Sequence, residues 1–217
     1  NIQLFQKYIA LLDEVYQLSS KSSILDGDAS LVQAGKNTNE IIIPKMSLDG
    51  LADYSRNSGY TKGNVTLTYE TVKFNYDRGR KFVVDAMDDE ETAGIAFGKL
   101  SSEFIRTKVV PEMDAFRFAT YASLAGIGKA TGTLADGAAV ITALRAAANK
   151  MDEDEVPAEQ RVLFITPTLR GMIDDLDTSK SKEVLAKFSS VVEVPQSRFN
   201  TQINLLDGTT GGEEAGG

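Results

Sequence analysis

The sequence predicts an α+β fold, in which a hairpin and a long helix precede a small α/β domain. Three observations carry this prediction. A run of strand-forming residues, "VTLTYETVKFNY" (65–76), follows a glycine-rich loop. A helical apolar stripe extends to both sides of Pro111, and a helix, strand, helix unit follows residue 137. A hairpin, one long helix and a small α/β unit together make a mixed fold.

The N-terminal part predicts a helix followed by an extended arm. Residues 2–18 place apolar side chains at helical spacing, which is typical of an amphipathic helix packed on its own domain. The polar, glycine-punctuated passage 25–40 then leads to a short apolar run, Ile41–Ile43. We expect a short strand there that ends at Pro44.

The next segment predicts a long loop feeding a long strand. Its first part, "SLDGLADYSRNSGYTKGN" (47–64), is rich in glycine and polar residues. Within the strand that follows, the apolar alternation slips between Tyr69 and Val72, so we expect a β-bulge or a twist there. After it, "DRGR" (77–80) predicts a turn and "KFVV" (81–84) a returning or continuing strand.

Residues 90–123 predict one helix, kinked near Pro111, that is the longest element of the chain. At 1.5 Å per residue such a helix is roughly 50 Å long. The acidic residues 88–91 at its head fit a helix N-terminus, where negative side chains are favoured. They lack the spaced oxygen ligands of a calcium loop, so we favour the solvated helix start over a metal site.

The glycine-rich segment 125–137 invites comparison with a phosphate-binding loop, but the template fails. Ala130 follows Lys129 where a Ser or Thr is required, and Ser123 occupies the place of the first glycine. We therefore interpret this segment as an inter-domain connector. No specifically bound nucleotide is expected.

The residues after the connector predict a small α/β domain. Its parts are an alanine-rich helix, 138–151, a buried strand, 161–167, and a helix that Thr166 caps and Pro167 opens. Residues 188–201 add another strand and a loop.

Composition excludes several kinds of chemistry. The 217 residues include no cysteine and no histidine, so the chain offers no cysteine nucleophile, histidine base, disulfide or Cys/His zinc site. The formal net charge of -8 argues against general nucleic-acid binding. Apolar runs are too short to span a bilayer, which predicts a soluble protein made in the cytoplasm. We expect no enzyme activity and no bound metal or cofactor; a carboxylate or Ser/Lys enzyme is the weaker alternative.

Four segments carry a resemblance to a known family. They are "YDRGRKFVVDAMDDEET" (76–92), "FIRTKVVPEMDAFRFA" (104–119), "AAANKMDEDEVPAEQRVLFITP" (146–167) and "VVEVPQSRF" (191–199). Over essentially the whole chain, the sequence resembles the major capsid protein of tailed bacteriophages, with the Hong Kong ninety-seven phage fold.

The resemblance implies a domain organisation. It consists of an N-terminal arm and helix (1–46), an extended hairpin loop (47–80), a peripheral domain with a long spine helix (81–124) and an axial domain (125–217). Family members continue well past the point where this sequence ends, so the resemblance implies an incomplete axial domain. Scaffolding would be separate, already cleaved or unnecessary.

The resemblance also implies a function. The chain would assemble with itself into hexamers and pentamers of an icosahedral phage or prophage head around double-stranded DNA, with scaffolding, portal and decoration proteins as further partners. No membrane and no specific nucleic-acid sequence would be bound. An encapsulin-like shell around a cargo enzyme is the alternative. Some relatives crosslink a loop lysine, but we do not carry that role to Lys62, since a solvated loop lysine explains it.

We expect the hairpin from about Ser47 to Arg80 to find its partner on another subunit, because its tip has few aliphatic residues with which to pack on its own domain. A hairpin folded back on its own sheet is the alternative. Predicted interface residues combine aromatic, aliphatic and cationic side chains. They are Leu51, Tyr54, Arg56, Tyr60, Lys62, Arg78 and Arg80.

Overall fold

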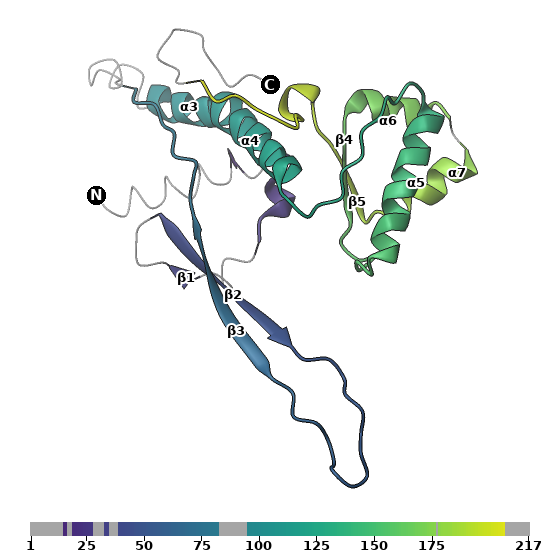
Figure 1. Ribbon diagram of the computed structural model, residues 1–217. Coiled ribbons are helices and arrows are strands. Elements are labelled where there is room, and N and C mark those ends of the chain that lie inside the picture. The colour runs from purple at the N-terminus through teal and green to yellow at the C-terminus, as the bar shows by residue number, and fades with distance from the viewer. Residues whose placement is uncertain are drawn as a thin grey trace. The chain divides into compact units, whose positions relative to one another are not determined.

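The structure is a computed structural model that describes residues 15–16, 19–27, 33–34, 39–82, 95–176 and 178–206. It is a mixed α/β protein with helices and two small sheets (Figure 1). Two compact units divide the chain: Leu25–Val84 forms one, and Asn1–Ile24 with Asp85–Gly217 forms the other. Most of the predicted helix 2–18, the acidic head 88–91 and residues 83–84 lie outside the described residues.

The first unit is a three-stranded antiparallel sheet in the order β1-β2-β3. The strands are β1 (Gln33–Ala34), β2 (Glu40–Leu48) and β3 (Val65–Lys73). Only two residues of β1 pair with β2, whereas β2 and β3 pair along their full nine-residue length. The result is a long two-stranded ribbon with a short third strand near one end (Figure 1). Below, β2 and β3 are called the stem and residues 49–64 the tip.

The prediction that the first strand ends at Pro44 is wrong, because β2 continues through the proline to Leu48. Hydrogen bonds join the Phe74 N–H to the Asn39 carbonyl and the Asp49 N–H to the Asn64 carbonyl. Hydrogen-bonded and non-hydrogen-bonded pairs alternate along an antiparallel ladder, so these two bonds make Pro44 and Tyr69 a non-hydrogen-bonded pair. The missing proline N–H therefore faces away from β3, on a side where β1 does not reach, and no ladder bond is lost.

Of the two predicted alternatives, a β-bulge or a twist, the bulge is wrong. From Glu40↔Lys73 to Leu48↔Val65 the register of the stem is constant, without an extra residue on either strand. All nine residues of β3 are exposed, so no buried face constrains the alternation of this strand. Residues 77–82 form neither the predicted turn nor a strand.

One helical rod runs without interruption from α3 (Ile95–Phe104) through a π-helical turn (η3, Ile105–Val109) into α4 (Val110–Ser123). This confirms the predicted long helix over residues 95–123. The wide turn lies directly before Pro111, where the Val110 N–H bonds the Ile105 carbonyl five residues back. Such a π-turn accommodates a proline ring without breaking the rod.

The second unit also contains a parallel pair of strands with three helices. These elements are α5 (Gly137–Glu153), β4 (Val162–Ile165), α6 (Pro167–Asp174), α7 (Ser179–Leu185) and β5 (Ser190–Glu193), followed by a 3-10 turn, η4 (Gln196–Arg198). Another 3-10 turn, η1 (Ser23–Leu25), lies at the boundary between the two units. Because β4 and β5 are parallel, the chain needs a crossover between them, and α6 and α7 supply it.

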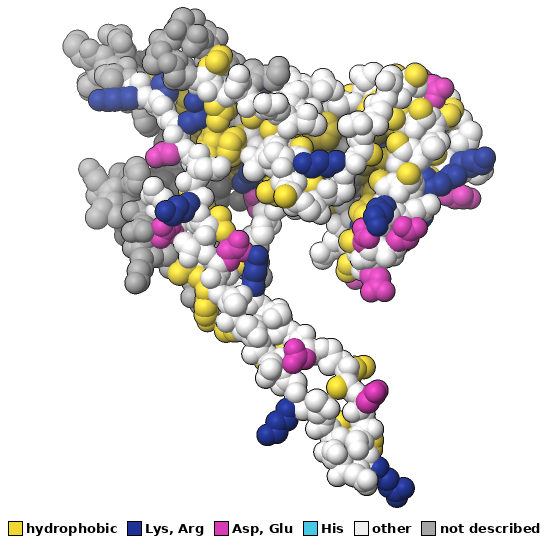
Figure 2. Space-filling view, viewed as in Figure 1, with side chains coloured by type: hydrophobic (Ala, Val, Ile, Leu, Met, Phe, Trp, Pro, Cys, Tyr) yellow, Lys and Arg dark blue, Asp and Glu magenta, His cyan; other side chains and the backbone are white. Residues whose placement is uncertain are grey.

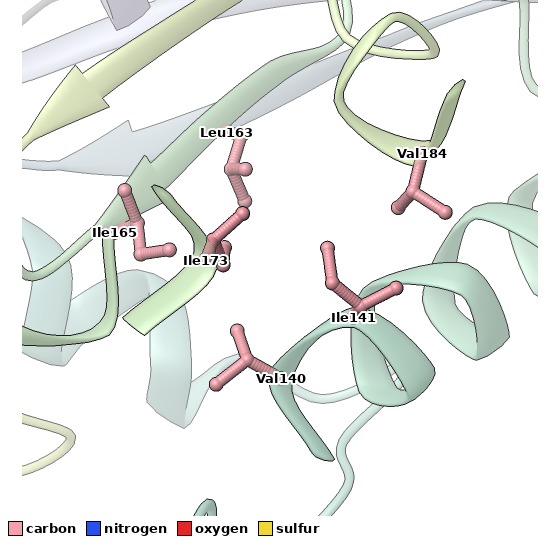
Figure 3. Packing of buried hydrophobic residues seen from close by; sticks show 6 residues of the cluster. All are labelled: Val140, Ile141, Leu163, Ile165, Ile173 and Val184. Carbon is pink, nitrogen blue, oxygen red and sulfur yellow. The ribbon is translucent and has the colours of Figure 1, made fainter. Parts of the chain in front are cut away.

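Buried aliphatic side chains from α5, β4, α6 and α7 converge on one core (Figure 3). They are Val140, Ile141, Leu163, Ile165, Ile173 and Val184. The opposite face of β4 is covered as well: the ring of Phe118 in α4 meets those of Phe164 and Phe199 edge-on, both at 5.1 Å between centroids. The four residues of β4 are therefore enclosed on both sides.

Helix starts were predicted only in part. Asp136 caps α5 through a 2.8 Å bond from the Ala139 N–H. Pro167 opens α6 as expected, but Thr166 makes no capping bond with its side chain. The helix α7 was missed, although Thr178 and Ser181 form a reciprocal capping box at its start.

Candidate functional site

The stem of the hairpin has two chemically different faces. Cross-strand partners point to the same side of a sheet, so every second pair shares a face. One face of the outer stem carries only apolar side chains, which we call the apolar stem face. Its residues are Pro44, Met46, Leu48, Val65, Leu67 and Tyr69.

The apolar stem face is open to solvent. Apart from Pro44, all of its residues are between 53% and 66% exposed. Because these residues form non-hydrogen-bonded pairs, their side chains lie close together across the two strands. Contiguous exposed apolar side chains of this kind mark contact surfaces in soluble proteins. Figure 2 shows hydrophobic side chains along the stem.

The opposite face of the outer stem is polar. Lys45 and Glu70 form an ion pair there, and the Thr68 hydroxyl donates to the Lys45 carbonyl at 3.4 Å. Ser47 and Thr66 make the next cross-strand pair on this side. The ribbon is thus suited to lie with one face against an apolar surface and the other in water.

The tip is an ordered turn. Ser55 and Gly59 exchange two backbone hydrogen bonds of 3.2 and 2.7 Å, and Gly59 has a φ of 74°, which glycine adopts without strain. The rings of Tyr54 and Tyr60 flank this bridge with centroids 4.9 Å apart. An Asn64 N–H bond of 2.7 Å to the Asp49 carboxylate closes the tip where it joins the stem.

The structure places the predicted interface residues in two groups. Leu51, Arg56 and Lys62 are exposed in the tip with the tyrosine pair, and neither cation has an ion-pair partner among the described residues. Arg78 and Arg80 are exposed as well, but they follow the other end of β3. The tip and the base are thus separated by the length of the stem.

Sequence reasoning missed the apolar stem face. The pattern "PKMSL" does alternate apolar and polar residues, which is the signal of a half-buried strand. Ending the first strand at Pro44 hid this pattern, since Leu48 then belonged to the predicted loop 47–64 and Met46 to no strand. Only the pairing with β3 brings them beside Leu67 and Val65.

Charge is distributed unevenly between the two units. Residues 25–84 contain eight Lys and Arg against seven Asp and Glu, a formal charge of +1. The remainder of the chain contains 15 against 24, a formal charge of -9. The hairpin unit is therefore nearly neutral, and almost all of the net negative charge lies in the other unit.

Asp152, in the second unit, is an ion-paired carboxylate. Hydrogen bonds from Arg161 and then Lys187 lower the pKa of Asp152, so this carboxyl stays ionised and is unsuited to act as a general acid. Arg161 is itself buried and also donates to the carbonyls of Val156 and Pro157, which fixes the acidic loop before β4. Within the described ranges, no three acidic residues gather in a metal-binding group.

No described helix is long and apolar enough to cross a membrane. The comparisons with known proteins give no further assignment: no family model matches the chain, and no significant match is found among curated proteins or solved structures. The hairpin and its exposed surfaces are therefore the candidate functional site.

Proposed function

We propose that this chain is a structural major capsid (coat) protein of the Hong Kong ninety-seven phage fold. It acts without catalysis, assembling with itself into hexamers and pentamers of an icosahedral head around the double-stranded DNA of a tailed phage or prophage. Its synthesis takes place in the cytoplasm of the bacterial host and its place of action is the virion. Scaffolding, portal and decoration proteins are its further partners.

The apolar stem face is the observation that carries the proposal. A two-stranded ribbon is marginally stable in water, and this one presents its apolar side chains to solvent. Binding against another subunit would remove these side chains from water, at roughly 25 cal/mol for each Å² buried. The opposite, polar face would remain hydrated. A self-associating protein has a use for such a ribbon that an isolated subunit lacks.

The long helix and the small α/β region support the same proposal. In this proposal the rod Ile95–Ser123 would serve as the spine helix, and residues 137–206 would form part of the axial domain (125–217) that the resemblance implies. Phe118 and Phe164 pack these two parts together. A braced subunit of this kind suits a thin shell, because the rod can keep its shape while the hairpin contacts a neighbour.

The test replaces the cross-strand pair Met46 and Leu67 with threonine in the full-length protein. Threonine retains strand propensity but weakens the apolar face. The unaltered protein is expected to form closed megadalton particles in negative-stain images and light scattering. The double variant should lose at least nine-tenths of them, while its far-UV circular dichroism stays unchanged because both side chains are exposed.

The matched control exchanges a pair on the polar face, Ser47→Thr with Thr66→Ser, and should assemble normally. Normal shells from the Met46→Thr, Leu67→Thr variant would show that the apolar stem face is not the contact. Absence of closed particles from the unaltered full-length protein, across protein concentration and with its scaffold supplied, would overturn the capsid proposal itself.

Replacing residues 51–64 with a short Gly/Ser turn tests the tip separately. The helices should persist, because the tip packs through its own turn and tyrosine pair. We expect particles to be lost, since the replacement removes the exposed leucine, tyrosines and cations of the predicted interface. Unfolding of the helices in this variant would refute an independent tip.

A further inference from the structure

The buried carboxylate of Asp114, in α4, binds a short segment from near the start of the chain. Its Oδ1 accepts from the hydroxyls of Ser20 and Ser22, both at 2.7 Å. The backbone N–H of Lys21 donates to Oδ2 at 2.9 Å, and that of Ser22 to Oδ1 at 3.1 Å. Arg198, in η4, approaches Oδ2 at 3.4 Å. One side chain thus joins three parts of the chain.

Within the described residues 19–25, polar contacts hold this segment on α4. Ser20 and Ser22 are buried, whereas the next apolar side chains, Ile24 and Leu25, are 49% and 39% exposed. Arg117, one turn after Asp114, donates to the Ser22 hydroxyl at 3.2 Å and lies over the Tyr16 ring. Four hydrogen bonds from residues 20–22 thus converge on one anion, which makes them stronger than bonds between neutral groups.

The hydrophobic core lies elsewhere. Every buried residue of the core cluster belongs to α5, β4, α6 or α7. The other face of β4 is covered by Phe118 and Phe199. Neither contact involves residues 19–25, so removal of this segment leaves the packing of β4 in place.

We propose that Asp114 is a releasable latch. It holds residues 20–22 against α4, and breaking it frees this segment while α4 and the α/β core remain folded. The chain passes into the hairpin unit directly after Ile24, so the latch fixes the beginning of one connection to that unit. This inference does not depend on the proposed capsid function, because the latch is a property of the single chain.

The test measures tryptic cleavage after Lys21 in the full chain. The Lys21 side chain is exposed, but its backbone N–H is bound to Asp114, and a protease requires the segment to detach. Asp114→Asn places an amide donor where the carboxylate accepted N–H and hydroxyl groups. We expect cleavage after Lys21 to become at least tenfold faster, with cleavage after Lys129 in the exposed connector unchanged.

A second variant, Ser20→Ala with Ser22→Ala, removes both hydroxyl donors and keeps the carboxylate. It should accelerate cleavage after Lys21 by a smaller factor. If Asp114→Asn does not fold, this variant alone tests whether the contacts with Asp114 hold residues 20–22. Asp174→Asn, which removes an exposed carboxylate paired with Arg170, is the control and should change nothing at Lys21.

Two results would overturn the latch. In the first, Asp114→Asn and the double serine variant are both cleaved after Lys21 at the unaltered rate. In the second, faster cleavage after Lys21 is accompanied by faster cleavage after Arg145 in α5 and by loss of helical circular dichroism, which would mean that the segment and the core unfold together.

Discussion

The stem of the hairpin and the strand β4 contain similar apolar residues, but β4 buries them and the stem exposes them. In β4, Leu163 and Ile165 are buried against three helices, and Phe164 packs on α4 on the other side. In the stem, Met46 and Leu67 are paired across strands that are more than twice as long, yet both are more than half exposed. Strand length therefore does not indicate where the core lies. The helices α5, α6 and α7 around β4 make its four residues central, whereas the apolar face of the stem is open to solvent.

A substitution in the core should lower the free energy of unfolding far more than a substitution in the stem. Ile173→Ala should lower the free energy of unfolding by about 2–5 kcal/mol, because Ile173 is 1% exposed and its removal leaves a cavity in the core. Leu67→Ala should change it by less than about 0.5 kcal/mol, since that side chain is solvated. Urea unfolding of the unassembled protein, followed by circular dichroism at 222 nm, measures both. Similar losses from the two variants would mean that the stem contributes to the folded core.

Two glycines of the α/β region, Gly137 and Gly171, should respond to alanine with opposite changes in the free energy of unfolding. A Cβ at Gly137, where α5 begins, would lie 2.1 Å from the Met172 carbonyl oxygen and 2.9 Å from the Leu176 side chain. Gly137→Ala should therefore lower the free energy of unfolding by about 1–3 kcal/mol despite the better helix propensity of alanine.

Gly171→Ala is the matched control, because Gly171 lies within α6 with nothing within 4 Å of its added Cβ. Alanine should raise the free energy of unfolding there by about 0.5–1 kcal/mol. Opposite signs for the two variants in the same urea titration are the expected result. A neutral Gly137→Ala would show that α5 and α6 can move apart without loss.

The smallest effect concerns pH. The pKa of Asp152 is lowered in the folded protein by its hydrogen bonds with Arg161 and Lys187. Its contribution to stability is therefore present above the ordinary pKa of 3.8 and is lost as the pH falls through the lower, folded value. The difference in unfolding midpoint between the unaltered protein and Asp152→Asn should shrink below pH 3.8.

Unfolding titrations at pH 7, 4, 3 and 2 test this dependence. Asp175→Asn, at the end of α6, serves as the control, since the Asp175 carboxylate has no ion-pair partner in the described part of the chain. A difference between Asp152→Asn and the unaltered protein that stays constant down to pH 2 would exclude the ion pair as its cause.

Local patterns in the sequence determined the helices and the central strand. The alanine-rich run predicts α5 to within two residues of its ends, and "VLFI" predicts β4. The apolar stripes beside Pro111 predict the rod that ends at Ser123. These elements could be predicted because helical and strand periodicities appear within a few consecutive residues. The missed helix α7 is only seven residues long, too short for a clear stripe.

Only tertiary structure decided the apolar stem face and the latch. Met46 and Leu67 face the same side because β2 and β3 pair in one register, and the sequence carried no buried face that would specify that register. Asp114 lies in an amphipathic helix, where an isolated aspartate is typical of a solvated position. It is buried because Ser20 and Ser22, more than 90 residues earlier, supply hydroxyl and backbone donors to its carboxylate. Contacts between residues so far apart in the chain leave no local period, so the sequence alone did not predict them.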